Sequence, residues 1–402
     1  MAIDDEKFLY LCSWGTFEEV ISALNEGANP NAKDIECRTA LMRAAHYNGD
    51  SRIITALLDA GANIRARSIY RMTALDWADN WILDKEKTEE IRRVLKSAML
   101  SMNPIDDDIF TILCRCADSE EVKAALKKGA SPNAQDIYST SVLMWASCYE
   151  GKLWLAELML SEGADPDLRD DRGRSALMFA AECCESPVMI SALIDAGADV
   201  NAKDNDGATA LMISAMYGTP VMMTAILDSG AEINARDNQR RPALFYAIRN
   251  ENTESAKILV QSLSKAGKNL RTIRDSEGKT ALMYAAEKCA DPELIRTLIE
   301  AGSDVNARDN HGTTALMYAA AKNVRPEILY ALINSGADLN AQNEGGNTAL
   351  ILAAMNRLYL AILGGRLKIK PQNLKILIDA GADPYITNNG GLTFSDYISR
   401  KS

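Results

Sequence analysis

The chain has 402 residues, of which 47% are hydrophobic and 25% are charged. This composition is typical of a folded, soluble protein and argues against a disordered chain. The formal net charge is −11 at pH 7. An acidic surface repels phosphate groups, so we expect no direct contact with nucleic acid. The acidic start and the lack of a long apolar segment after it predict neither a secretory signal nor a membrane span.

Two short strings recur from near the start of the chain to near its end. The first is Gly-Ala-Asp-x-Asn-Ala or a close variant, and Thr-Ala-Leu-Met follows it about a dozen residues later. Successive copies of the second string often begin 34 residues apart, as from Thr39 to Thr73 and from Thr280 to Thr314. A fixed period of this length is typical of stacked structural repeats.

A single copy illustrates the unit that the repeats predict. Residues 175–184 predict a short helix, and residues 188–196 predict a second helix whose apolar side chains share one face. Pro187 suits the first turn of the second helix. Gly197 follows its last turn, where a left-handed residue ends a helix without steric cost. Residues 199–207 then predict an extended hairpin that ends in a turn.

This helix–turn–helix–hairpin unit resembles the ankyrin repeat. The resemblance rests on Asp-Asn-Asp-Gly-Ala-Thr-Ala-Leu-Met at 204–212 and on Gly-Ala-Asp-Val-Asn-Ala at 197–202. It implies an all-α ankyrin-repeat solenoid of about twelve helix-turn-helix units with short β-hairpin loops. The family's Thr-Pro-Leu-His is Thr-Ala-Leu-Met here, so we expect methionine packing to replace the histidine's hydrogen bonds. This variant resembles ankyrin proteins of bacteria.

The period breaks near residue 100. Residues 8–34 match residues 110–136 at a constant offset, and both lack the Thr-Ala-Leu-Met string, as an N-terminal capping repeat would. Asp76 replaces the methionine of the string. Because a capping repeat needs a polar outer face, Asp76 predicts that a first array ends at this repeat, within the chain. We therefore predict a short N-terminal ankyrin array over 1–100, a joint over 101–108, and a longer C-terminal array over 109–402.

An insertion is predicted at 358–371, where the gap between repeats lengthens. It holds Arg366, Lys368 and Lys370 in an otherwise acidic protein. Insertions in solenoids map to surface loops and often lie at the binding face. The alternative is a longer helical hairpin that only shields the end of the array.

No pattern in the sequence predicts catalysis or metal binding. His46 and His311 have no nucleophile at a recognisable spacing, and the eight cysteines form neither a Cys-x-x-Cys pair nor a zinc pattern. The cysteines are expected to be reduced thiols, which predicts a cytoplasmic protein. We therefore expect that the protein is not an enzyme and that it binds neither a cofactor nor a metal.

A binding surface is what the sequence does predict. The resemblance implies a concave face made of hairpin tips and the ends of first helices. Tyr, Trp, Met and Arg collect at these positions, and such residues are enriched at interface hot spots. At the same positions a tyrosine can instead pack on a neighbouring repeat. The predicted partner-binding residues are Tyr138, Tyr149, Met216, Tyr217, Arg240, Arg241, Arg249, Tyr47, Tyr70 and Trp81.

These observations favour a non-catalytic protein that binds another protein and sequesters or inhibits it. The alternative is a scaffold, or an effector secreted without a signal, that recruits a host or cellular protein. An enzyme site hidden in an irregular repeat and a receptor for a peptide or small molecule are less favoured. No membrane partner is expected, and the sequence leaves the oligomeric state and the identity of the partner open.

Overall fold

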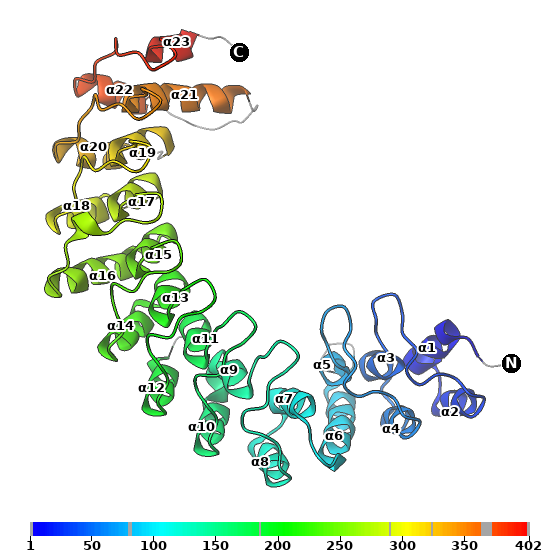
Figure 1. Cartoon of the computed structure of the whole chain (residues 1–402). Helices are drawn as coiled ribbons and strands as arrows, with labels where there is room; N and C mark the ends of the chain where they lie inside the picture. Colours follow the sequence, from blue (N-terminus) through cyan, green and yellow to red (C-terminus); the bar gives the residue numbers. More distant parts are fainter. Residues whose placement is uncertain are drawn as a thin grey trace. The chain divides into compact units, whose positions relative to one another are not determined.

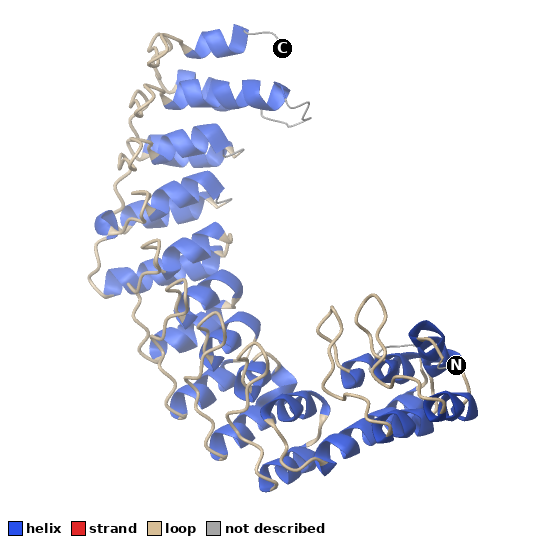
Figure 2. Cartoon of the chain, turned by 45° about the vertical axis from the view of Figure 1, so that its right-hand side comes forward, coloured by secondary structure: helices blue, strands red, loops and turns tan. Residues whose placement is uncertain are grey.

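The computed structural model describes residues 3–78, 83–184, 186–288, 291–322, 325–362 and 372–399, without the side chains of residues 150 and 356–362. In this part of the chain the elements are 23 α-helices and two short 3-10 helices joined by loops (Figure 2). The predicted all-α solenoid is confirmed. The predicted hairpins contain no strand among the described residues, and only isolated bridges pair Lys33 with Thr39 and Gln135 with Ser141.

Two helices alternate along the chain in each repeat. The first helices are α1 (Asp5–Trp14), α3 (Ala40–Tyr47), α5 (Ala74–Ala78), α7 (Asp107–Cys116), α9 (Val142–Ser147), α11 (Ala176–Cys183), α13 (Ala210–Tyr217), α15 (Ala243–Arg249), α17 (Ala281–Lys288), α19 (Ala315–Lys322), α21 (Ala349–Ile362) and α23 (Phe394–Ser399). The second helices are α2 (Phe17–Asn25), α4 (Ser51–Asp59), α6 (Lys85–Ser101), α8 (Ser119–Lys127), α10 (Leu153–Ser161), α12 (Pro187–Asp195), α14 (Pro220–Asp228), α16 (Thr253–Lys265), α18 (Pro292–Glu300), α20 (Pro326–Asn334) and α22 (Gln372–Asp379). The 3-10 helices are η1 (Glu150–Lys152) and η2 (Leu270–Thr272).

The helices form two compact units. Unit 1 comprises residues 1–146 and 152–171, and unit 2 comprises residues 147–151 and 172–402. In unit 2 each first helix from α11 to α21 contacts the next first helix, and each second helix from α12 to α20 contacts the next second helix (Figure 1). The same two rows run through α1 to α6 in unit 1. Within these two rows, every repeat therefore packs on its sequence neighbours.

Short apolar side chains on the first helices form the contact between repeats. In α11, Leu177, Met178, Ala180 and Ala181 are buried, and the equivalent residues of α13, α17 and α19 are buried as well. Alanine lets neighbouring helices approach closely, while leucine and methionine fill the remaining space. No single repeat buries this face alone, so stacking supplies the stability.

Local signals set the ends of the helices as the sequence predicts. The Thr209 side chain caps α13 by accepting a hydrogen bond from the backbone N–H of Met212. Pro187 occupies the first turn of α12. Gly197 follows the last turn with φ +95°, a conformation that glycine adopts without strain. Gly207 meets a second demand, because an added Cβ would lie 2.9 Å from the backbone nitrogen of Asn238.

The methionine of the Thr-Ala-Leu-Met string does more than pack. Its sulfur lies 3.4 Å from the backbone nitrogen of the capping residue in the Thr39–Met42 and Thr280–Met283 pairs. A thioether is a weak acceptor, so it partly satisfies an N–H group that the helix leaves free. The expectation that methionine acts by packing alone is therefore wrong. Asp76 makes the same contact with a carboxylate, 2.7 Å from the nitrogen of Thr73.

The predicted joint at 101–108 contains the last residue of α6 and the first residues of α7. Ser101, Asn103 and Pro104 are exposed. Two aspartates in the C-terminal half of the joint form ion pairs with residues that precede it, Asp106 with Arg65 and Asp108 with Arg67. The predicted insertion at 358–371 begins within α21, which continues to Ile362. Its basic residues lie outside the described part of the chain, namely Arg366, Lys368 and Lys370.

Limited proteolysis tests the predicted division into arrays over 1–100 and 109–402. A protease of low specificity should cut first within 101–108, because Ser101, Asn103 and Pro104 are exposed and residues 102–106 lie between two helices. The fragment that begins near residue 109 should keep its helical circular dichroism after purification. A fragment that unfolds, or a first cut at another loop, would show that the chain is one continuous stack.

Candidate binding surface

A single Asp or Asn side chain builds each hairpin turn in unit 2. The Oδ1 atom of Asp204 accepts hydrogen bonds from the backbone nitrogens of Asp206 at 3.0 Å and Ala208 at 2.7 Å. This closes an Asx turn, so the residues between the two donors form a defined tip. The turn residues that accept the same pair of bonds are Asp237, Asp275, Asp309, Asn343 and Asn388.

Backbone hydrogen bonds also connect the tips to one another. The N–H of Asn205 donates to the carbonyl of Arg172 at 2.9 Å, and the N–H of Asn238 donates to the carbonyl of Asp206 at 2.9 Å. The same bond recurs at later tips, whose donors are Ser276, Asn310, Glu344 and Asn389. The spacing between successive tips is therefore held by backbone groups, whatever side chains the tips carry.

The second carboxylate oxygen of the turn residue usually binds a tyrosine nine residues later. The Tyr246 hydroxyl donates to Asp237 Oδ2 at 2.6 Å, and Arg241 Nε donates to the same oxygen at 2.7 Å. Tyr284 and Tyr318 make the equivalent bonds to their own turn residues at 2.8 Å. Burial alone would raise the pKa of Asp237, but the bonds from Tyr246 and Arg241 hold it below its usual value.

Asp204 departs from this pattern. Isoleucine stands nine residues later, at position 213. Among the described residues no group donates to Asp204 Oδ2, while Oδ1 is fully used by the turn. Burial raises the pKa of the Asp204 carboxyl group, and nearby Asp206 raises it further. The backbone hydrogen bonds to the carboxylate and the nearby Arg174 lower it in part. Asp204 is thus a half-buried carboxylate with one free oxygen.

A groove of about 510 Å³ opens at this carboxylate. Its walls are the tips around residues 172–174, 204–208 and 238–241 and the last turns of α11, α13 and α15. Four of the predicted binding residues line it together, namely Met216, Tyr217, Arg241 and Arg249. We call these walls the inner surface of unit 2.

The four residues differ in how freely they face the groove. Tyr217 is 56% exposed, and Arg249 is exposed at the last turn of α15. Met216 is half-buried. The Arg241 guanidinium is held by Asp237, and its side chain is only 14% exposed. Arg241 therefore shapes the wall of the groove, whereas Tyr217 and Arg249 offer most of the contact area.

The other predicted residues do not line this groove. Tyr149 is exposed within unit 2, and Arg240 is an exposed tip residue with φ +63°. In unit 1 the Tyr138 ring lies under the Arg71 guanidinium, 4.1 Å from ring centroid to Cζ, while Tyr70 is exposed at its own tip. Of the last two predicted residues, Tyr47 packs against Trp14 and His46. The other, Trp81, lies outside the described residues.

The histidines occupy structural and surface positions. His46 is buried, its Nδ1 lies 3.2 Å from the carbonyl of Trp77, and burial lowers its pKa. His311 is exposed at a tip, 3.5 Å from Glu344. Within the described ranges no three metal-ligating side chains gather into a possible metal site. Over the same ranges no helix is both long and apolar enough to cross a bilayer.

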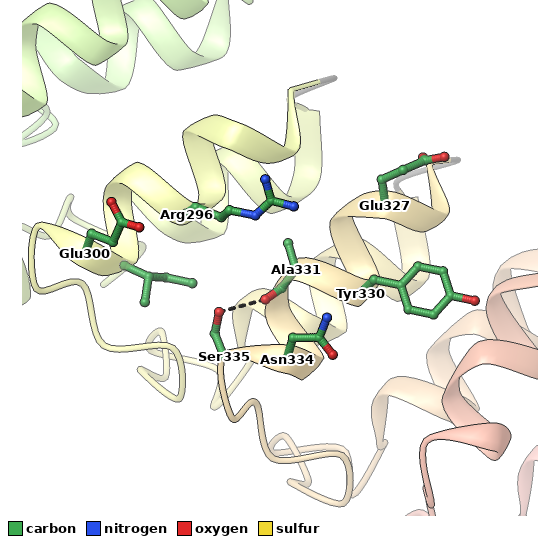
Figure 3. Close-up of a pocket in the computed structure, with 8 residues that line it drawn as sticks. Arg296, Glu300, Glu327, Tyr330, Ala331, Asn334 and Ser335 are labelled. Atoms are coloured by element: carbon green, nitrogen blue, oxygen red, sulfur yellow. Dashed lines mark hydrogen bonds between the residues drawn. The ribbon is translucent and has the colours of Figure 1, made fainter.

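A second groove, of about 400 Å³, lies between second helices of unit 2 (Figure 3). Arg296 and Glu300 come from α18, and Tyr330 and Ser335 come from α20 and the residue after it. Arg296 already pairs with Glu293 at 2.8 Å, and the Ser335 hydroxyl donates to the carbonyl of Ala331 at 2.7 Å. This groove offers one exposed tyrosine and a partly committed arginine, so it is the weaker candidate.

Reasoning from the sequence missed the Asp–Tyr pairs and the free oxygen of Asp204. The available signal was the residue type nine positions after each turn residue, which is tyrosine after Asp237, Asp275 and Asp309 but isoleucine after Asp204. Using this signal requires knowing that a turn residue contacts the residue nine positions later, and only the folded repeat shows that contact.

Comparison with known proteins gives the family. A model of three consecutive ankyrin repeats matches residues 143–237, 222–309 and 288–388, and a single-repeat model matches residues 36–69. The first model covers more than half of the chain, and the chain belongs to the ankyrin-repeat family. Ankyrin repeats form a protein–protein interaction domain, and proteins built from them are in general non-catalytic binding modules.

One relative adds a partial similarity. An ankyrin repeat protein of fowlpox virus (strain NVSL) is 28% identical over 123 residues, which make up 31% of this chain. The chain covers only 17% of the length of the viral protein.

Two matched substitutions test the contrast between the turn carboxylates. Asp237→Asn should lower the free energy of unfolding by about 1 to 3 kcal/mol, because the new amide group faces the donors of Tyr246 and Arg241. Asp204→Asn should change it by less than about 0.5 kcal/mol at neutral pH, because asparagine already closes the turns at 343 and 388. Urea unfolding followed by circular dichroism measures both.

The pH dependence of the same variants gives a second check. Because the pKa of Asp237 is lowered in the folded state, its ionised carboxylate stabilises the fold above the unfolded-state pKa of about 3.9. This stability is lost as the pH falls through the folded-state pKa. The raised pKa of Asp204 acts in the opposite sense, so stability is lost as pH rises through its folded-state pKa. Asp204→Asn should therefore avoid the small loss of stability that the wild type shows as the pH rises above about 4. Equal effects of the two substitutions would contradict these assignments.

Proposed function

We propose that the chain binds a protein partner through the inner surface of unit 2 and thereby sequesters or inhibits it. The observation that carries this proposal is the groove at Asp204, where Met216, Tyr217 and Arg249 come together. As part of the same proposal, the protein acts in the cytoplasm.

The energetics of this surface support binding. Tyr217 offers a large rigid ring that is mostly exposed, so covering it gains area at low cost in side-chain entropy. Arg249 supplies a planar fork of donors beside it. The tips are held by Asx turns and by hydrogen bonds between neighbours, so the surface is ordered before a partner arrives. Preorganisation of this kind reduces the free-energy cost of association.

The free oxygen of Asp204 indicates one group that the partner should present to this groove, which arginines such as Arg174 and Arg249 also line. Asp204 has an oxygen that accepts no hydrogen bond from the described residues, and Asp206 lies beside it. A lysine or arginine side chain would satisfy that oxygen and favour the ionised carboxylate. The net charge of −11 adds a long-range attraction for a basic partner.

Truncation of the exposed tyrosine tests the proposal. Tyr217→Ala should weaken partner binding by about 2 kcal/mol, roughly thirtyfold in Kd. The melting temperature should remain nearly unchanged, because the ring is largely exposed. The measurement is capture from lysate of the source cells by the purified full chain, followed by titration calorimetry with the captured protein.

Tyr330→Ala is the matched control, because that ring is 50% exposed but lies on a second helix. It should leave capture intact. Loss of capture in Tyr330→Ala, with full capture by Tyr217→Ala, would move the site to the second helices. A large drop in melting temperature with unaltered capture would instead make Tyr217 a packing residue.

The activity of the captured protein separates inhibition from recruitment. A sequestering protein should abolish that activity at an equimolar ratio, and Tyr217→Ala should restore it in proportion to the lost affinity. Unchanged activity in a tight complex would favour the alternative, a scaffold or effector.

A further inference from the structure

Three cysteines from two neighbouring repeats meet at one end of their first helices. Cys148 directly follows α9, and α11 ends at Cys183. The Cys184 thiol donates a hydrogen bond to the carbonyl of Ser147 at 2.8 Å, which brings the end of one helix against the end of the other. The Cys183 side chain lies close enough to that of Cys148 to raise the pKa of the Cys148 thiol. The sulfur atoms of Cys148 and Cys183 are therefore neighbours, although 34 residues separate them in the chain.

The three thiols differ in access to solvent. Cys183 is exposed, Cys148 is half-buried, and Cys184 is buried. Burial raises the pKa of the Cys148 thiol, and the nearby Cys183 thiol raises it further. Cys148 therefore stays protonated and is poorly placed to meet an oxidant first. Cys183 is accessible and has a second thiol already in contact, an arrangement typical of redox-sensitive cysteine pairs.

We infer that Cys148 and Cys183 form a reversible disulfide when the protein meets a hydroperoxide. The chemistry takes two balanced steps. The Cys183 sulfur, having lost its proton, attacks the terminal peroxide oxygen, so the O–O bond breaks and the thiol becomes a sulfenic acid while the peroxide is reduced. The Cys148 sulfur then attacks the Cys183 sulfur, the S–O bond breaks, and the hydroxyl leaves with the Cys148 proton as water.

The second step is intramolecular, and the closeness of the two thiols offsets the raised pKa of Cys148. The bridge would join two adjacent repeats next to the exposed ring of Tyr149. The inference is independent of the proposed partner, and its test needs no partner.

Peptide mapping after peroxide treatment tests the pair. The full chain is treated with hydrogen peroxide, free thiols are alkylated, and proteolytic peptides are analysed by mass spectrometry with and without a dithiol reductant. A linked peptide that joins Cys148 to Cys183 should appear, two hydrogens lighter than its parts, and should vanish on reduction. Cys37 is an internal control, because it is exposed but lies in a hairpin of unit 1. It should remain open to alkylation, or become a sulfenic acid, without joining this bridge.

Serine variants show which sulfur plays which part. Cys148→Ser should lose the linked peptide and accumulate sulfenic acid on Cys183, seen as a severalfold increase in labelling by dimedone. Cys184→Ser should still form the bridge, because its hydroxyl can keep the bond to Ser147. Cys183→Ser should abolish both signals, with circular dichroism confirming that it is folded.

Three results would overturn the inference. The first is a linked peptide that survives in Cys183→Ser. The second is a bridge between Cys183 and Cys184 in place of the bridge to Cys148. The third is oxidation of Cys183 without any link in the wild-type chain.

Discussion

The rest of the structure depends on the apolar contact between the first helices of neighbouring repeats. The repeats are built from pairs of helices, and the inner side chains of α11, such as Leu177 and Met178, are buried because the next repeat covers them. Alanines beside them keep the helices close. Once this contact is formed, the packed helices fix the position of each hairpin. The regular spacing of the hairpin tips therefore results from the packing of the helices.

The turn residues convert that packing into a usable surface. Their first oxygen closes the turns of unit 2 from Asp204 to Asn388, and the partner of the second side-chain atom varies from turn to turn. Pairing with tyrosine, as at Asp237, joins the tip to its own helix. The unpaired oxygen of Asp204 breaks the rule at the point where the groove with Tyr217 and Arg249 opens. A local departure from a repeated structural bond thus coincides with the best candidate for recognition, as is common at functional sites.

Much of the fold could be predicted from the sequence, because a repeated period with capping residues and glycines specifies the same helix pair many times. The placement of Tyr217 and Arg249 at exposed helix ends followed from that period. The bonding of individual side chains did not follow. Arg241 is bound by Asp237, and Tyr47 packs on Trp14, because these contacts depend on which residue stands opposite in three dimensions. The methionine sulfur as an acceptor for the helix cap was missed for the same reason.

The most direct measurement of the central claim is amide hydrogen exchange of the full chain, alone and with its captured partner. Binding at the inner surface of unit 2 predicts slower exchange in the tips at 204–208 and 238–241 and in the last turns of α13 and α15. Exchange in α18 and α20, which line the second groove, should not change. Protection confined to α18 and α20, with the two tips unaffected, would contradict the account.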